Sequence, residues 1–256
     1  MTDKYKSSRP GSIRSELRSL ANPEKAVILM RFFKTGPGDY GEGDRFLGVV
    51  VPHIRKIVKR HRDASEKEVL KLLHSKYHEE RLTALLILVE QFKRGDESRK
   101  KAIYDLYLGN TSFINNWDLV DLTAQHIVGE YLFGKDISVL TRLAHSKNLW
   151  ERRIAMLSTY YFIRHSDSEA TLRIAGLLLR DSHDLIHKAV GWMLREVGKR
   201  CSMESECRFL DAYAGVMPRT MLRYAVERFP KDLRSRYMSA KGIPPSPGKH
   251  LRPART

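Results

Sequence analysis

The segment RIAML, residues 153–157, decides the fold, because its pattern of one cation followed by small and apolar residues recurs along the chain. The other copies are RLTAL at residues 81–85 and KAVGW at residues 188–192, and each of the three follows a short polar turn. Trp117 opens a helical segment midway between the first two copies. The four starting positions are 36, 36 and 35 residues apart, and a further step of 35 reaches Arg223. This series indicates an internal repeat.

Around these segments the chain has the pattern of helices in pairs. Helix-start signals recur, because Asn22, Ser65 and Asn148 each have an acid two or three residues on. Residues 36–43 are rich in glycine and predict a loop. No segment alternates apolar and polar residues as a half-buried strand does. Helices are predicted over residues 26–34, 52–62, 66–73, 78–93, 99–108, 117–132, 137–144, 149–164, 169–179, 184–199, 204–214, 219–228 and 231–237.

Helix pairs that repeat with this period are typical of an α-solenoid. The sequence therefore predicts an all-α fold, an α-solenoid of HEAT-like helical repeats with a concave basic face. We expect this domain to span residues 15–238, after a flexible N-terminus at residues 1–14. Residues 239–256 hold four cations, four prolines and no acid, and predict a disordered basic tail.

The charge of the chain favours a polyanionic partner. The formal net charge is +16 and the pI is about 9.9. The tail supplies +4 of that charge, so residues 1–238 carry the other +12. Nucleic acid is the most common partner of such a basic chain. No apolar run approaches the roughly 18 residues of a membrane-spanning helix, and the N-terminus lacks the apolar segment of a secretory signal.

Few motifs of cofactor or metal chemistry occur. The two cysteines, Cys201 and Cys207, cannot form a disulfide scaffold or a four-thiolate metal site. His183 and His187 are four residues apart, but no third metal ligand accompanies them. No phosphate-binding glycine loop and no serine-hydrolase motif is present. We therefore expect no metal, no cofactor and a reducing, cytoplasmic location.

The repeat predicts which side chains share a surface. Equivalent positions of successive repeats stack into columns, so Arg81, Trp117, Arg153, Lys188 and Arg223 form one column. One turn further on, Asp121 and Trp192 occupy the next column on the same helix face. Trp117, Asp121, Arg153 and Trp192 are therefore expected to converge on one basic surface.

Each of these residues also has a purely structural explanation. Trp117 and Trp192 could pack in the core, and Arg153 could form a surface ion pair with Glu151 or Asp184. Asp118 lies in the first turn of its helix, where an acid favours the helix dipole, and we interpret it as structural. Asp121 lies beyond that turn. A carboxylate on a basic surface that faces nucleic acid would repel phosphate, unless a cation belongs beside it.

Three segments carry a resemblance to a known family. They are residues 116–121 (NWDLVD), 149–153 (LWERR) and 187–196 (HKAVGWMLRE), which resemble the AlkD-type DNA glycosylases, as do residues 22–26 and 46–49. The resemblance covers roughly residues 15–238. It implies that Asp121 is the active-site aspartate, that Trp117 and Trp192 are the active-site tryptophans, and that Arg153 contacts phosphate. Phe32 stands where the family has a tyrosine.

The resemblance also implies a reaction. Members of the family excise alkylated bases such as 3-methyladenine and 7-methylguanine from double-stranded DNA, without a pocket that encloses the base. Such bases are cationic and leave as neutral molecules, so no strong general acid is needed. One carboxylate could stabilise the positive charge that develops on the sugar. The tryptophans could hold the cation, and Arg153, Arg81, Lys188 and Phe32 could contact DNA.

These observations lead to two alternative hypotheses. The first is a monomeric, monofunctional DNA-alkylbase glycosylase associated with the nucleoid. The alternative is a non-catalytic HEAT-like scaffold that binds DNA or another partner, since most such solenoids are scaffolds. A scaffold would need the basic column but not the carboxylate of Asp121.

Overall fold

The computed structural model describes residues 12–240 and is all-α. Helices make up almost all of its regular structure, and no strand occurs within that range beyond one isolated bridge between Arg45 and Tyr77. The predicted fold class is thereby confirmed. Helix α1 (Ile13–Ser19) begins two residues before the predicted domain start at residue 15, so residues 13 and 14 are helical. The rest of the predicted N-terminal segment and nearly all of the predicted tail lie outside the described residues.

None of the helices described between residues 12 and 240 combines the length and apolar character that crossing a bilayer requires.

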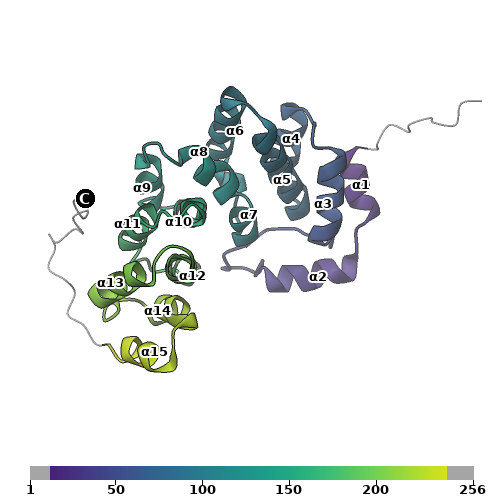
Figure 1. Ribbon diagram of the computed structural model, residues 1–256. Helices are drawn as coiled ribbons and strands as arrows, with labels where there is room; N and C mark the ends of the chain where they lie inside the picture. Colours follow the sequence, from purple (N-terminus) through teal and green to yellow (C-terminus); the bar gives the residue numbers. More distant parts are fainter. Residues whose placement is uncertain (1–11, 241–256) are drawn as a thin grey trace, which may run out of the picture. The chain divides into compact units, whose positions relative to one another are not determined.

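The chain divides into two compact units, Met1–Ile127 and Val128–Thr256. In the first unit, the long helix α5 (His78–Arg94) lies at the centre and is buried along most of its length. Helices α1, α3 (Val51–Arg60), α4 (Glu66–Leu73), α6 (Glu97–Gly109) and α7 (Trp117–Asp121) pack against it. Helix α2 (Pro23–Phe32) completes the unit (Figure 1). The predicted caps are confirmed, because the Asn22 and Ser65 side chains accept backbone N–H bonds from the first turns of α2 and α4.

The loop predicted at residues 36–43 is confirmed, and buried charge anchors the segment that follows it. The carboxylate of Glu79 accepts the backbone N–H groups of Leu47, Gly48 and Val49 at 2.8, 2.8 and 3.1 Å. Gly48 has a φ of +84°, and a Cβ placed on it would lie 2.1 Å from the Asn22 carbonyl oxygen. Only glycine fits this position, since L-residues avoid that φ and the backbone leaves no room.

The helix predicted over residues 117–132 is interrupted, so that prediction is wrong. Helix α7 ends at Asp121, and a turn leads into a π-helix at Gln125–Gly129 and a short α8 (Glu130–Leu132). The hydroxyl of Thr123 donates to the Leu119 carbonyl and lies 2.9 Å from the Tyr107 hydroxyl. Side-chain bonds of this kind satisfy backbone groups locally and compete with a regular helix. Asp121 therefore lies at a helix end.

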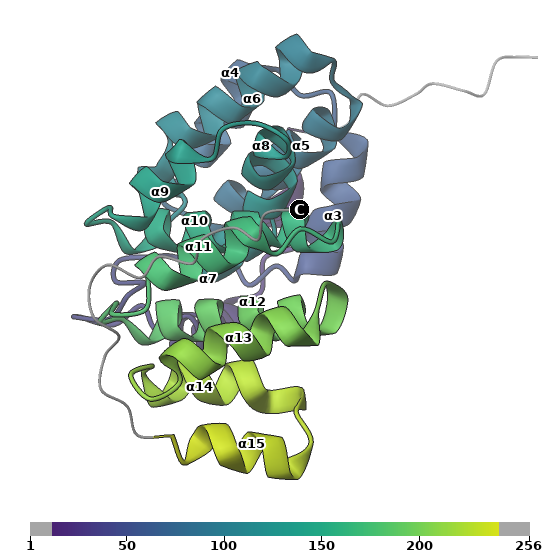
Figure 2. The ribbon, with the colours of Figure 1, turned by 60° about the vertical axis from the view of Figure 1, so that its left-hand side comes forward.

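The second unit is a stack of helix pairs. Helices α10 (Leu149–Arg164), α12 (Asp184–Arg200) and α14 (Arg219–Ala225) pack in succession, and α14 continues into a 3₁₀ turn at Val226–Arg228. Helices α9 (Ser138–Ala144), α11 (Glu169–Leu177) and α13 (Met203–Tyr213) cover one side of that row (Figures 1 and 2). Helix α15 (Lys231–Met238) ends the stack. This arrangement agrees with the predicted HEAT-like repeats.

Two glycines allow neighbouring helices of this stack to touch. A Cβ placed on Gly191 of α12 would lie 2.3 Å from the Met221 carbonyl oxygen of α14. One placed on Gly129 would lie 2.2 Å from the Ser158 carbonyl oxygen of α10. Gly191 therefore lets α14 approach α12 closely.

Candidate active site

The side chain of Trp117 packs on an aromatic cluster at the start of α7. Its ring stacks on Phe33, with centroids 5.0 Å apart, and meets Phe32 edge-on at 5.8 Å. Phe33 belongs to the buried core beneath α2, whereas Phe32 is 61% exposed. Trp117 itself is half-buried. The structure therefore brings Trp117 and Phe32 together and gives Trp117 both a core face and a partly accessible one.

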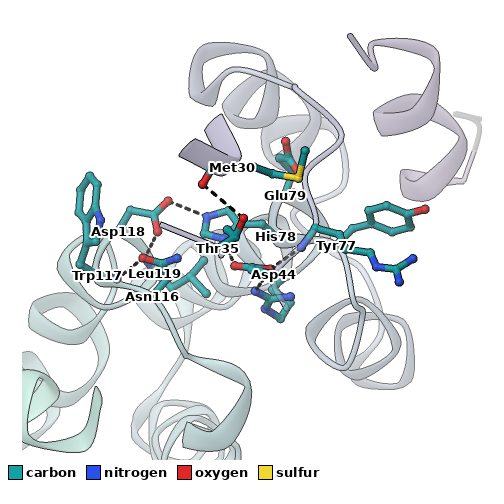
Figure 3. Close-up of polar contacts among 12 residues, drawn as sticks. Met30, Thr35, Asp44, Tyr77, His78, Glu79, Asn116, Trp117, Asp118 and Leu119 are labelled. Carbon is teal, nitrogen blue, oxygen red and sulfur yellow. Dashed lines mark hydrogen bonds and ion pairs between the residues drawn. The ribbon is translucent and has the colours of Figure 1, made fainter. Parts of the chain in front are cut away.

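Asp118, the next residue, belongs to a buried charge network (Figure 3). Its Oδ2 lies 2.8 Å from Nε2 of His78, and Oδ2 of Asp44 lies 2.9 Å from Nδ1 of the same imidazole. Burial alone would lower the pKa of His78, but the two carboxylates outweigh it and raise that pKa to about 9. The imidazole is therefore an imidazolium at neutral pH and donates to both carboxylates. The structural interpretation of Asp118 is confirmed.

Arg81 is the other cation of this network. Its guanidinium donates to Asp44 Oδ1 at 2.7 Å and to the Ser75 carbonyl at 3.0 Å. Its exposed fraction is 4%. This burial contradicts the prediction that Arg81 lies on a DNA-facing surface. The repeat pattern identified a cation at this position but could not show that Asp44, in a distant loop, neutralises it.

Asp121 lines a cavity of about 340 Å³ within the first unit. Helices α3 and α5 also line it, and the turn after α7 contributes Leu122, Gln125 and His126. Four cations line the cavity, namely Arg55, Lys59, Arg62 and Lys93. Burial raises the pKa of the Tyr107 hydroxyl above its ordinary value, and the negative charge of Asp121 adds to that rise. The structure thus places one predicted catalytic carboxylate in a cavity that four cations also line.

The remaining predicted residues belong to the second unit. Arg153 is 5% exposed, and its guanidinium donates to the Leu185 carbonyl at the start of α12 at 2.5 Å. Lys188 forms an ion pair with Asp184 at 2.7 Å. Trp192 is half-buried, with its ring centroid 6.2 Å from that of Tyr160. The burial of Arg153 leaves little of its guanidinium accessible to a phosphate. The convergence of Arg153 and Trp192 with Asp121 stays a prediction.

Sequence reasoning missed the cations of α3. The predicted basic helix over residues 52–62 contained Arg55 and Lys59, but α3 lies before the first repeat copy and so had no column position. It also missed His78, whose two acidic partners lie 34 and 40 residues away in the sequence. Within residues 12–240 no group of histidine, cysteine and acidic side chains has the arrangement of a metal site.

Comparison with known proteins relates the chain to a protein family and to a solved structure. A sequence model of the DNA alkylation repair enzyme family matches residues 13–229 of the chain. The fold resembles the solved structure of a predicted DNA alkylation repair enzyme from Enterococcus faecalis, with a TM-score of 0.63 and 16% sequence identity. That likeness covers 82% of this chain and 97% of the other. No curated protein matches the chain at a significant level of similarity.

Proposed function

Because the chain belongs to the DNA alkylation repair enzyme family, which supports a role in DNA repair, we propose that it is a monofunctional DNA glycosylase. Its substrates are 3-methyladenine and 7-methylguanine in double-stranded DNA, and it acts as a monomer. The observation that carries the proposal is the position of Asp121, a carboxylate on the wall of a cationic cavity. On a surface that only binds phosphate, a carboxylate at that place would repel the ligand.

The proposed reaction is hydrolysis of the N-glycosidic bond. The bond between C1′ and the alkylated base breaks, and the base takes the electron pair and leaves as a neutral molecule. Water then adds to C1′ and releases a proton to solvent. The sugar carries positive charge while the bond breaks, and the carboxylate of Asp121 stabilises that charge. A fixed charge in a partly enclosed site is effective because little solvent reorganises around it.

The tryptophans act on the cationic base. A positively charged ring is attracted to the face of an indole, and Trp117 and Trp192 each keep a partly accessible side chain. Trp117 is held in place by its stacking on Phe33, so its orientation is fixed before the DNA arrives. Phe32 extends this aromatic surface but has no hydroxyl to donate. Neither tryptophan needs to enclose the base in a pocket.

DNA contacts come from the exposed cations. Lys188 is half-exposed and Arg223 is exposed, and both occupy the column position of Arg153. Arg81 is excluded from this set by its burial. Contacts of this kind bind the backbone of any sequence alike, so the specificity for damage rests on the charge of the lesion.

The test is base release from defined duplexes. One duplex carries 7-methylguanine, a second is treated to carry 3-methyladenine, and a third carries uracil, which is a neutral base. We expect the purified protein to release both methylated bases and to leave uracil in place. Efficient release of uracil would show that the mechanism is wrong. Binding of all three duplexes with no release would instead favour the non-catalytic scaffold.

A further inference from the structure

One face of α3 presents cations to the cavity that Asp121 lines. Arg55 and Lys59 are four residues apart on α3, so they share a helix face, and Arg62 follows in the turn after the helix. All three side chains are exposed. Lys93 of α5 lines the same cavity. Four cations against the two acids of the lining, Asp121 and Glu90, leave an excess of positive charge.

That excess of positive charge resides on Arg55 and Lys59, because the other two cations of the lining each have a carboxylate nearby. Lys93 lies 3.5 Å from the carboxylate of Glu90, and Arg62 lies 3.7 Å from that of Asp63. The side chains of Arg55 and Lys59 form no hydrogen bond or ion pair with any other residue between 12 and 240. By contrast, Arg60, the next residue on α3, has Glu16 as its carboxylate partner. Two neighbouring cations that line a cavity and lack such a partner are suited to an anionic ligand.

We propose that Arg55 and Lys59 bind backbone phosphates of the strand that carries the lesion, and so position its deoxyribose against Asp121. This inference rests on the proposed function. Side chains at i and i+4 lie about 5–6 Å apart at Cβ, so the pair can hold one phosphate between them or two successive ones. The cavity supplies the geometry, because Arg55, Lys59 and Asp121 line the same space of about 340 Å³.

Arg55 and Lys59 carry the opposite charge to Asp121, and each charge suits a different part of the bound strand. A phosphate beside Asp121 alone would be repelled, which would push the strand away from the carboxylate. Arg55 and Lys59 offset that repulsion and hold the phosphate on their own side. The sugar, which becomes positive as the bond breaks, is then the part of the strand that meets Asp121. Arg55 and Lys59 are positioning residues in this scheme, and Asp121 is the catalytic one.

The experiment compares two double variants that remove the same charge. Arg55→Ala/Lys59→Ala removes the proposed pair. Lys56→Ala/Lys67→Ala is the matched control, since both lysines are exposed on α3 and α4 and neither lines this cavity. Binding of undamaged and methylated duplexes is measured by fluorescence anisotropy over a range of salt concentrations. Release of 7-methylguanine is measured in single turnover with protein in excess.

We expect Arg55→Ala/Lys59→Ala to reduce the magnitude of the log–log salt slope by about 0.9 if the pair holds one phosphate and by about 1.8 if it holds two, because each neutralised phosphate contributes about 0.9. The single-turnover rate at saturating protein should fall at least tenfold, because the sugar is no longer held against Asp121. The control should keep both values close to those of the unaltered protein. A thermal midpoint within about 2 °C of the parent in both variants shows that the fold is intact.

Other outcomes separate this inference from the proposed function. If the parent releases methylated bases and the two double variants behave alike, the inference is overturned and the glycosylase stands. If no protein releases base but only Arg55→Ala/Lys59→Ala lowers the salt slope, the phosphate site stands and the glycosylase fails. Inorganic phosphate at constant ionic strength tests the other source of the ligand. If inorganic phosphate raises the thermal midpoint of the parent but not that of Arg55→Ala/Lys59→Ala, and the two proteins have equal salt slopes for DNA binding, the cavity binds free phosphate and the inference is overturned.

Discussion

Asp118 and Asp121 lie three positions apart on α7, and their carboxylates have different environments. Asp118 is 7% exposed and is bonded to the His78 imidazolium, whereas Asp121 lines the cationic cavity. Asp118 therefore helps to fix the helix, whereas Asp121 shares its cavity with four cations. We propose that the first acid is structural and the second catalytic, and each role can be tested by removing the charge alone.

Asp121→Asn should lower the single-turnover rate of base release by about 100-fold or more, since loss of one preorganised electrostatic group has about that effect. Affinity for DNA should hold or rise, because a negative charge near the phosphates has been removed. The thermal midpoint should barely change. Asp118→Asn is unsuitable as a control because it breaks a buried ion pair. Asp105→Asn on α6, at an exposed ion pair with Lys101, is the better match. Near-normal release by Asp121→Asn would remove Asp121 from the mechanism.

His78→Gln should destabilise the protein by about 3 kcal/mol at pH 6, because it leaves the buried Asp118 without its cation and leaves Asp44 with Arg81 alone. The pKa of His78 is raised from 6.5 to about 9 by folding, so its stabilisation is complete below about pH 6.5 and is lost as the pH rises through 9. The difference in unfolding free energy between parent and variant should therefore narrow by pH 9.5. Urea unfolding at pH 6 and at pH 9.5 measures this difference in free energy. If the difference is the same at both pH values, His78 is not charged in the folded protein.

Glu206→Gln should stabilise the protein at pH 8 and have little effect near pH 4.5. Burial raises the pKa of Glu206 to about 8, and Arg195 opposes that rise only in part. Because the folded pKa exceeds the unfolded value, the stability of the parent falls as the pH increases from about 4.5 to 8. Glutamine cannot ionise and avoids this loss. We expect the thermal midpoint of the variant to exceed that of the parent by about 3 °C or more at pH 8.

Glu204→Gln, at an exposed position of the same helix, provides the comparison for Glu206. It should shift the thermal midpoint by the same small amount at both pH values. A gain for Glu206→Gln that does not depend on pH would show that packing, and not ionisation, is responsible.

Gly191→Ala should destabilise the second unit by about 1–3 kcal/mol, the usual cost of overpacking a tight contact. The added methyl group meets the Met221 carbonyl oxygen at 2.3 Å, which α14 can relieve only by moving away. Gly176→Ala is the matched control, because a Cβ there has nothing within 4 Å and alanine favours a helix. That control should be neutral or stabilising. Equal unfolding free energies for the two variants would contradict the close packing of α12 on α14.

The sequence was sufficient to predict most of the helices and the repeat, because these depend on local patterns, but it did not predict α1. Asn148 caps α10 as predicted. The interruption after Asp121 could not be read from the pattern, since it depends on a bond between Thr123 and Tyr107 of another helix. Arg81 is a cation at the same repeat position as the predicted surface cations, so the pattern could not distinguish it from them. Its burial depends on Asp44, which lies in a loop with no periodicity.

The first turn of α5 contains four consecutive buried charged residues, and each holds a different part of the unit. His78 bonds to α7, Glu79 holds the segment before α3, Glu80 pairs with Arg14 of α1, and Arg81 pairs with Asp44. None of these segments can detach without leaving a charge buried and unpaired, which costs several kcal/mol. Fraying of α1 or of the loop is therefore coupled to loss of α7. The N-terminal half of the chain should unfold cooperatively, as one block rather than helix by helix.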